Sequence, residues 1–310
     1  MKPQALGAAA LTAIAWGVTG IFVFLLPPVS AFYIAGGRLL LGLFCVLPWL
    51  LFSPAARAAV QDAVRRPVTY VFAALLSLYY LTATSGFQHA PVAEVALLLC
   101  VAPVFVLLLR QVRGDMPSRR EVGGATLALI GLAWILWPRL VGNDSSAHEN
   151  HLLGDLLAMT AAACTALYAD NYARLHRQGQ APDPFGTTCL TLLIGSAALL
   201  GLASLFAAPL PAALGQDSRS LWLLLGLGVL CTGIPSMCFA YASKHLPPLV
   251  TATISLLIPV FAALFAALFL DQVLPLSMLP GSLVLLAGVA LVLYGSCQPE
   301  AEVSAASVGE

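Results

Sequence analysis

The chain has 310 residues, of which 60% are hydrophobic and only 9% are charged. Soluble domains carry about a quarter charged residues, so this composition excludes a chain that is mostly covered by water. The 14 basic and 14 acidic residues cancel, so the net charge argues neither for nor against a nucleic-acid partner. We therefore expect a lipid bilayer, and no nucleic acid, as a partner of the chain.

Ten apolar stretches of roughly membrane-spanning length follow one another between polar or proline-rich breaks. A helix needs about 20 mostly apolar residues to cross a bilayer. The first stretch exceeds the apolar region of about 7–15 residues in a signal peptide, so we expect it to be a retained span. The ten predicted spans are residues 4–26, 30–52, 68–88, 91–111, 121–137, 154–175, 185–207, 220–243, 249–270 and 274–295.

The spans group into two units, at residues 4–138 and 154–296, followed by a tail. The tail, residues 297–310, consists mainly of small and acidic residues. Because such a segment buries too little apolar surface to become ordered, we predict that it is disordered.

The basic residues predict the orientation of the chain. With the N-terminus in the cytoplasm, eleven Lys and Arg residues fall on the cytoplasmic side, Arg139 and Arg219 fall outside, and Arg38 falls within a span. Cytoplasmic loops are enriched in Lys and Arg. This distribution predicts a multi-pass protein of a bacterial inner (plasma) membrane with both termini in the cytoplasm.

An internal repeat relates the two units. At a shift of 156 residues, the motif Pro-Val-Phe at 103–105 falls on the same motif at 259–261. After a slip of one residue, Gly124 and Gly131 fall on Gly281 and Gly288. Since five spans are an odd number, the second unit is inverted relative to the first, as in many secondary transporters. The sequence thus predicts an all-α polytopic membrane protein with ten transmembrane helices in two inverted five-helix repeats.

Several motifs recur at fixed places in these units: Trp16-Gly17, Arg38 within FYIAGGRLLLGL, the paired Pro-Val-Phe, and the glycine-rich last spans. Together they make residues 5–295 resemble the EamA-type repeats of the drug/metabolite transporter superfamily. Members often carry Gly-Glu after the fourth span of each unit, whereas this chain has Gly114-Asp115 and Asp271-Gln272. The resemblance implies a ten-helix permease, commonly an exporter of amino acids or related metabolites.

Arg38 is the leading candidate for substrate binding. It lies about eight residues into its span, or roughly 12 Å deep at about 1.5 Å per residue. Charges at such a depth face a cavity or a partner, so Arg38 is a carboxylate clamp, part of a gating ion pair, or a structural residue. Glu94, one turn into the fourth span, could neutralise Arg38 or bind a proton or an amine. Alternatively, Glu94 is an acidic residue stabilised by the helix N-terminus.

Aromatic and hydroxyl side chains near the middle of the bilayer complete the predicted substrate site. Transporter sites tend to lie at this depth, although small hydroxyls and aromatic rings also pack helices together. Thr165 and Thr232 lie at similar depth. The predicted substrate-binding residues are Trp16, Arg38, Tyr79, Tyr80, Glu94, Tyr168 and Ser236.

Coupling, gating and hinge residues are predicted from their positions. Asp170, near the cytoplasmic end of the sixth span, could pair with Lys244 or Arg174 as an inner gate, or reach the interface. Glu94 and Asp170 are candidates for proton coupling. Pro103 and Pro259 are predicted hinges, because proline frees a backbone carbonyl at matched points of the two units.

The sequence favours a secondary transporter that moves a small metabolite by alternating access and exports amino acids or related metabolites. The alternatives are an intramembrane enzyme and a membrane scaffold or sensor without transport activity. The chain has no Walker loop and no Gly-x-Ser-x-Gly motif. The histidines of 148–151 are three residues apart, unlike those of HExxH. We therefore expect no enzyme activity, no cofactor and no metal, protons as a possible coupling ion, and either a monomer or a homodimer.

Overall fold

The computed structural model describes residues 3–114, 116, 118–140, 151–206, 218–246 and 254–307, and the described part is helical with no β-strand. In the first half the apolar helices are α1 (Pro3–Gly17), α2 (Thr19–Leu25), α3 (Ala31–Phe52), α5 (Pro67–His89), α6 (Val92–Leu99), α7 (Ala102–Val112) and α8 (Arg119–Leu140). In the second half they are α9 (His151–Arg177), α10 (Pro184–Phe206), α12 (Ser218–Gly228), the π-helical turn η1 (Val229–Gly233), α13 (Ile234–His245), α15 (Ile258–Leu270) and α16 (Leu279–Ser307).

Eight helical segments of the described chain are long and apolar enough to cross a membrane, some of them formed by two consecutive helices. Two further apolar segments, Ile258–Leu270 and Leu279–Gly295, are shorter. The structure therefore confirms an all-helical polytopic membrane protein. The count of ten crossings in two inverted repeats stays a prediction.

Two helical segments differ from what the sequence predicted. A separate helix, α4 (Pro54–Arg65), lies between the second and third spans. It begins with Pro54 after Ser53, whose hydroxyl accepts a hydrogen bond from the N–H of Ala56, a favourable helix start. At the other end of the chain, α16 stays helical to Ser307, although we predicted disorder from residue 297. The alanines and glutamates of this segment are good helix formers and extend the apolar helix before them.

The fourth apolar segment of each half is interrupted at matched positions. The first is broken by a turn at Cys100 and Val101 before α7, and the second by a turn at Leu256 and Leu257 before α15. These turns are 156 residues apart, which is the shift of the repeat. Discontinuous helices of this kind line the binding sites of many secondary transporters.

The same segments also end alike. Gly114 follows α7 with φ 90°, and Asp271 follows α15 with φ 54°. Both lie in the left-handed region, which glycine enters freely and Asp tolerates better than most residues. Asp271 thus fills the turn position for which the second unit lacks the expected glycine.

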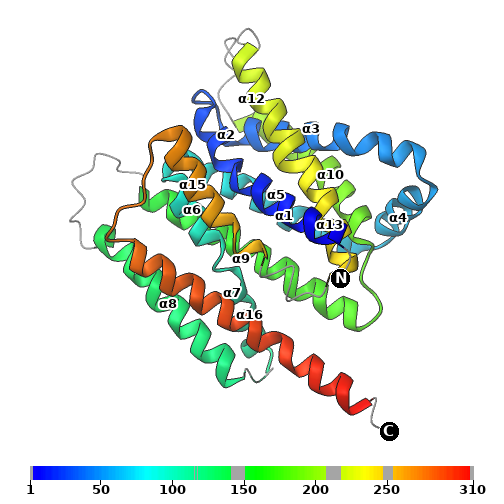
Figure 1. The fold of residues 1–310 in the computed structure, drawn as a ribbon. Coiled ribbons are helices and arrows are strands. Elements are labelled where there is room, and N and C mark those ends of the chain that lie inside the picture. Colours follow the sequence, from blue (N-terminus) through cyan, green and yellow to red (C-terminus); the bar gives the residue numbers. More distant parts are fainter. Residues whose placement is uncertain are drawn as a thin grey trace.

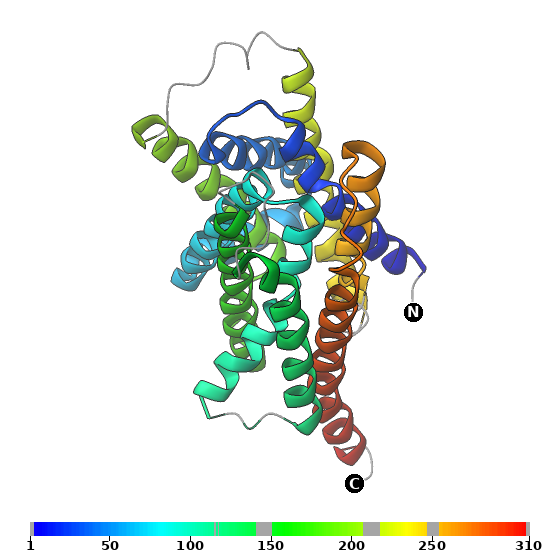
Figure 2. The same ribbon diagram turned by 90° about the vertical axis from the view of Figure 1, so that its left-hand side faces the viewer.

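The last helices of the two halves pack against each other in a reciprocal manner. Figure 1 shows α8 and α16 side by side, and they remain adjacent in the second view (Figure 2). A methyl group at Gly124 would lie 2.7 Å from the carbonyl oxygen of Gly288, and one at Gly131 would lie 2.6 Å from that of Gly281. Because Gly124 matches Gly281 and Gly131 matches Gly288 in the repeat, these are equivalent contacts about a pseudo-two-fold axis.

Other helix pairs follow the same rule. α1 packs against α15 and α13, while α9 packs against α7 and α5. Since α1 corresponds to α9 in the repeat, α15 to α7, and α13 to α5, each of these two contacts of α1 has its counterpart at α9. This pattern supports the predicted relation between the two halves.

We predict that Gly131→Ala destabilises the protein. The added methyl group would meet backbone atoms of α16, which cannot move aside as the end of a flexible side chain could. The expected loss in free energy of unfolding is about 1–3 kcal/mol. Gly123→Ala is the matched control, since nothing lies within 4 Å of its added methyl group. Thermal unfolding in detergent, followed by a thiol-reactive dye, should show a lower Tm for Gly131→Ala alone.

Candidate functional site

Arg38 is held between helices from both halves of the chain. It lies on α3 and is 3% exposed. Its Nε donates a hydrogen bond to the hydroxyl of Thr232 at 3.0 Å, and its Nη2 donates to the carbonyl oxygen of Cys231 at 3.4 Å. The guanidinium carbon lies 5.0 Å from the centre of the Tyr80 ring on α5. The structure therefore brings α3, α5 and η1 together around one buried cation.

The irregular backbone of η1 creates the acceptors that Arg38 uses. In an α-helix, the carbonyl of Cys231 would accept from the N–H of residue 235, but Pro235 has no N–H. The helix widens into a π-helical turn at this point, and the Thr232 hydroxyl donates to the Leu227 carbonyl at 2.9 Å. π-Helical turns occur frequently at functional sites. The missing N–H of Pro235 thus removes the α-helical donor of the Cys231 carbonyl, which accepts from Arg38 instead.

The described structure gives Arg38 no carboxylate partner. Ion pairs among the described residues include those of Arg66 with Asp62, Arg110 with Glu121 and Arg113 with Asp170. That Glu94 neutralises Arg38 stays a prediction. A buried cation without a counter-charge costs several kcal/mol, and the Tyr80 ring offsets about 2 kcal/mol of this cost at most. An anionic group entering this site would be strongly favoured.

Aromatic residues extend from Arg38 along the interface of α5 and α9. The Tyr79 ring lies 5.2 Å from that of Tyr80. Nearer the end of these helices, the rings of Tyr168 and Tyr172 lie 5.1 Å and 5.9 Å from that of Phe72. Tyrosine offers a flat apolar face and a polar tip, which suits a ligand that is part charged and part apolar.

The structure does not gather every predicted binding residue at Arg38. Arg38, Tyr79 and Tyr80 lie together, and Ser236 is one turn beyond Thr232, where its hydroxyl donates to the Thr232 carbonyl at 2.6 Å. Trp16 instead packs on Phe239 of α13, with ring centres 5.2 Å apart.

Tyr168 packs on Phe72. Glu94 is 3% exposed and lies in the first turn of α6. At the same helix start, the N–H of Val92 donates to the side chain of Gln272 at 3.2 Å.

The predicted hinge residues Pro103 and Pro259 each lie in the first turn after the matched helix breaks. Lys244 lies in α13, and its side chain is outside the described part of the structure.

Asp170 has a partner that the sequence did not indicate. Its carboxylate pairs with Arg113, which follows α7, and the same guanidinium donates to the side-chain oxygen of Asn171 at 3.3 Å. The structure thus pairs Asp170 with Arg113 and not with Arg174, while pairing with Lys244 stays a prediction. Arg113 reaches Asp170 because α7 packs directly against α9. The ion pair thus joins two spans at the end of the helices.

A second charged cluster, around Glu121, was not predicted, although the sequence contains a local signal for it. Ser118 and Glu121 form a capping box at the start of α8: the Ser118 N–H donates to Glu121 at 2.7 Å, and the Glu121 N–H donates to the Ser118 hydroxyl at 3.2 Å. The spacing Ser-x-x-Glu before an apolar run is the sequence signature of this motif. Arg110 of α7 pairs with the same carboxylate at 2.7 Å, so the turn between α7 and α8 is held at both ends.

These features define a multi-pass membrane protein with a polar, cationic centre between its two halves. The model of the EamA-like transporter family matches residues 4–137 and 152–294. The chain therefore belongs to this family and is a membrane transporter. Its family and relatives point to transport rather than to an enzyme.

Relatives of known sequence and structure agree with this assignment. An uncharacterized transporter of Archaeoglobus fulgidus is 28% identical over 257 residues, which cover 82% of this chain and 83% of the relative. The inner membrane protein YtfF of Escherichia coli is 25% identical over 310 residues, covering 92% and 93%. A protein of known crystal structure has the same fold, with a TM-score of 0.65 and 17% identity over 94% of this chain and 98% of that protein.

We predict that Arg113→Ala lowers the free energy of unfolding by about 2–3 kcal/mol, because it leaves the Asp170 carboxylate buried without a counter-charge. The Asp170 side chain is 4% exposed and that of Arg113 is 32% exposed. The matched control is Arg66→Ala, which removes an ion pair whose two side chains are 36% and 41% exposed. Such surface pairs contribute at most about 1 kcal/mol. Equal Tm shifts in the two variants would contradict the prediction.

Proposed function

We propose that this transporter is a secondary transporter that binds a small metabolite through an anionic group at Arg38 and exports amino acids or related metabolites. The observation that carries the proposal is the buried guanidinium of Arg38, which has no carboxylate partner in the described structure and lies between the two halves. A substrate carboxylate fits this site because guanidinium binds carboxylates in a planar, bidentate manner. The Tyr79 and Tyr80 rings would cover the apolar part of the substrate.

The matched contacts of the two halves support transport by alternating access. If the halves exchange conformations, equivalent contacts such as Gly124–Gly288 and Gly131–Gly281 can keep the same partners. The turns before α7 and α15 then provide matched points of bending, with Pro103 and Pro259 as the hinges. Rocking of two inverted units about a central site is how many secondary transporters work.

Asp170, Glu94 and Lys244 are the candidates for coupling and gating, and Asp170 acts here together with Arg113. Protonation of Asp170 would remove the counter-charge of Arg113 and release α7 from α9. This makes the Arg113–Asp170 pair the proposed gate. Glu94 is the second proposed proton site, and Lys244 remains a candidate for gating. Substrate-driven and proton-driven transport differ in whether a pH gradient changes the rate.

Arg38→Ala should reduce efflux of radiolabelled amino acids from proteoliposomes by at least about tenfold, since the anion loses its charged partner. Arg38→Lys should not restore it, because an ammonium cannot bind a carboxylate in the same planar geometry. Thr232→Val should raise KM by about tenfold by releasing the Arg38 side chain from its hydrogen bond.

Thr126→Val is the control for Thr232→Val. The Thr126 side chain is exposed on α8 and donates to its own helix at Val122, so this variant should transport at the wild-type rate. Tm values would establish that each variant is folded. Wild-type efflux by folded Arg38→Ala would overturn the role of Arg38.

The proposed orientation, with both termini in the cytoplasm, places the turn between α7 and α8 inside the cell. Met116 in this turn is 94% exposed, so Met116→Cys in a cysteine-free background should react readily with a maleimide. We expect a membrane-impermeant maleimide to label this cysteine only after the cells are permeabilised. Labelling in intact cells would reverse the orientation.

A further inference from the structure

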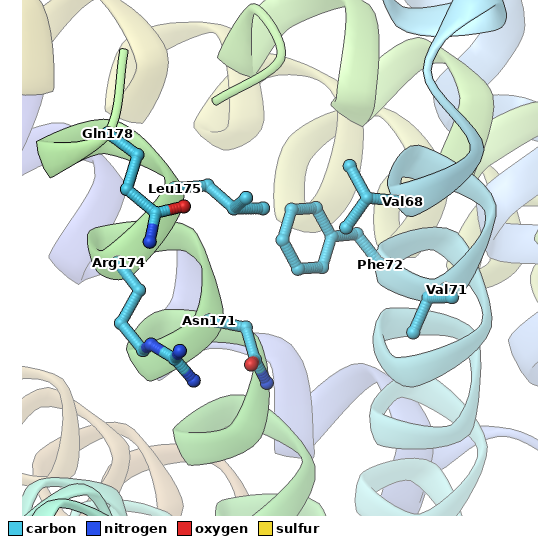
Figure 3. Close-up of a pocket in the computed structure, with 7 residues that line it drawn as sticks. All are labelled: Val68, Val71, Phe72, Asn171, Arg174, Leu175 and Gln178. Carbon is cyan, nitrogen blue, oxygen red and sulfur yellow. The ribbon is translucent and has the colours of Figure 1, made fainter. Parts of the chain in front are cut away.

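A cavity of about 280 Å³ lies between the ends of α5 and α9, apart from the residues that surround Arg38. The wall formed by α9 and its end is mainly polar and carries Asn171, Arg174 and Gln178, with Leu175 as its apolar member. The wall formed by α5 is apolar and carries Val68, Val71 and Phe72. Figure 3 shows these two sets of side chains on facing helices. The cavity therefore offers a polar half and an apolar half to the same ligand.

The polar half has unused hydrogen-bond donors. Asn171 donates to the Leu167 carbonyl at 2.7 Å and accepts from Arg113 at 3.3 Å. Arg174 and Gln178 form no side-chain hydrogen bond or ion pair with any residue that the structure describes. The guanidinium of Arg174 can therefore donate to an anionic group, and Gln178 follows directly after the end of α9.

The surface that leads into the cavity has the character of a lipid-facing surface. Leu153 and Leu156 of α9 are 47% and 57% exposed. They lie on the same face of α9 as Asn171 and Arg174, because 18 residues are five helical turns, but they are about 27 Å away and so belong to the opposite leaflet. This face of α9 is thus turned towards the lipid along its length and ends in amide and guanidinium groups.

The facing helix continues the apolar side. Val71 and Leu78, also on one face of their helix, are 57% and 44% exposed on α5. A phospholipid has the same order of chemistry, with an acyl chain at the depth of Val71 and Leu78 and a phosphate at the end of the span. Basic pockets between transmembrane helices at the membrane surface are typical sites for anionic headgroups.

We propose that the cavity between α5 and α9 binds an anionic membrane phospholipid, with its phosphate at Arg174 and Gln178 and an acyl chain along Val71 and Leu78. A soluble phosphate would use the same donors, but it would not use the apolar wall. Because Arg113 contacts both Asn171 and Asp170, the lipid would lie directly beside the ion pair that joins α7 to α9. This proposal does not depend on the substrate or on the direction of transport.

The test is lipid retention by the purified full chain in native mass spectrometry, with phosphatidylglycerol as the anionic probe and phosphatidylcholine as the zwitterionic one. Arg174→Ala and Arg174→Gln should each lower phosphatidylglycerol retention by about fivefold. This is the loss of affinity expected when one basic residue near an anionic lipid is removed. Arg177→Ala is the matched control, since it removes the same charge from the same helix end at a residue that does not line the cavity.

Three outcomes would overturn the proposal. One is unchanged phosphatidylglycerol retention in both Arg174 variants, and another is an equal loss in Arg177→Ala, which would indicate general attraction to basic residues. The third is displacement of the lipid by millimolar glycerol phosphate, which would make the cavity a site for soluble phosphates. The Tm of each lipid-free variant shows that it is folded, and amino-acid efflux tests the role of Arg38 separately.

Discussion

The interior of a bilayer offers no hydrogen-bond partners, so every broken helix and every charge within it must be satisfied by the protein itself. This constraint explains where the irregular parts of the chain lie. The π-helical turn η1 exposes the Cys231 carbonyl, and Arg38 from the other half of the chain donates to it. The start of α6, just after the break at Ala90, is met by Gln272 from the second half. Polar groups of one half thus complete the backbone of the other.

The same constraint gives the centre of the protein its chemistry. An arginine that only completed a broken helix would need a counter-charge nearby, because two neutral acceptors and one aromatic ring do not balance a buried cation. The described structure supplies Thr232, Cys231 and Tyr80 instead of a carboxylate. Under the proposed function, a bound anion would complete the balance. Stability of the empty protein and affinity for that anion would then be linked through Arg38.

Features that depend on local sequence were predictable, and features that depend on which helix faces meet were not. The apolar spans and the matched turns before Pro103 and Pro259 follow from run length and proline chemistry alone. The partner of Asp170 does not, because Arg113 reaches it only through the packing of α7 on α9. The sequence also contains local signals for the start of α8, in the capping box at Ser118, and for the start of α4, at Pro54. η1 arises from Pro235 together with the long-range contacts of Arg38, so proline alone could not predict it.

The repeat reproduces the backbone of the two halves but not their charges. At the shift of 156, Arg113 corresponds to Phe269, and at the shift of 148 that aligns Thr160 with Thr12, Asp170 corresponds to Phe22. The ion pair of Asp170 and Arg113 therefore has no charged counterpart at these positions of the other half. If the two halves exchange conformations as proposed, this ion pair would hold only one of the two states.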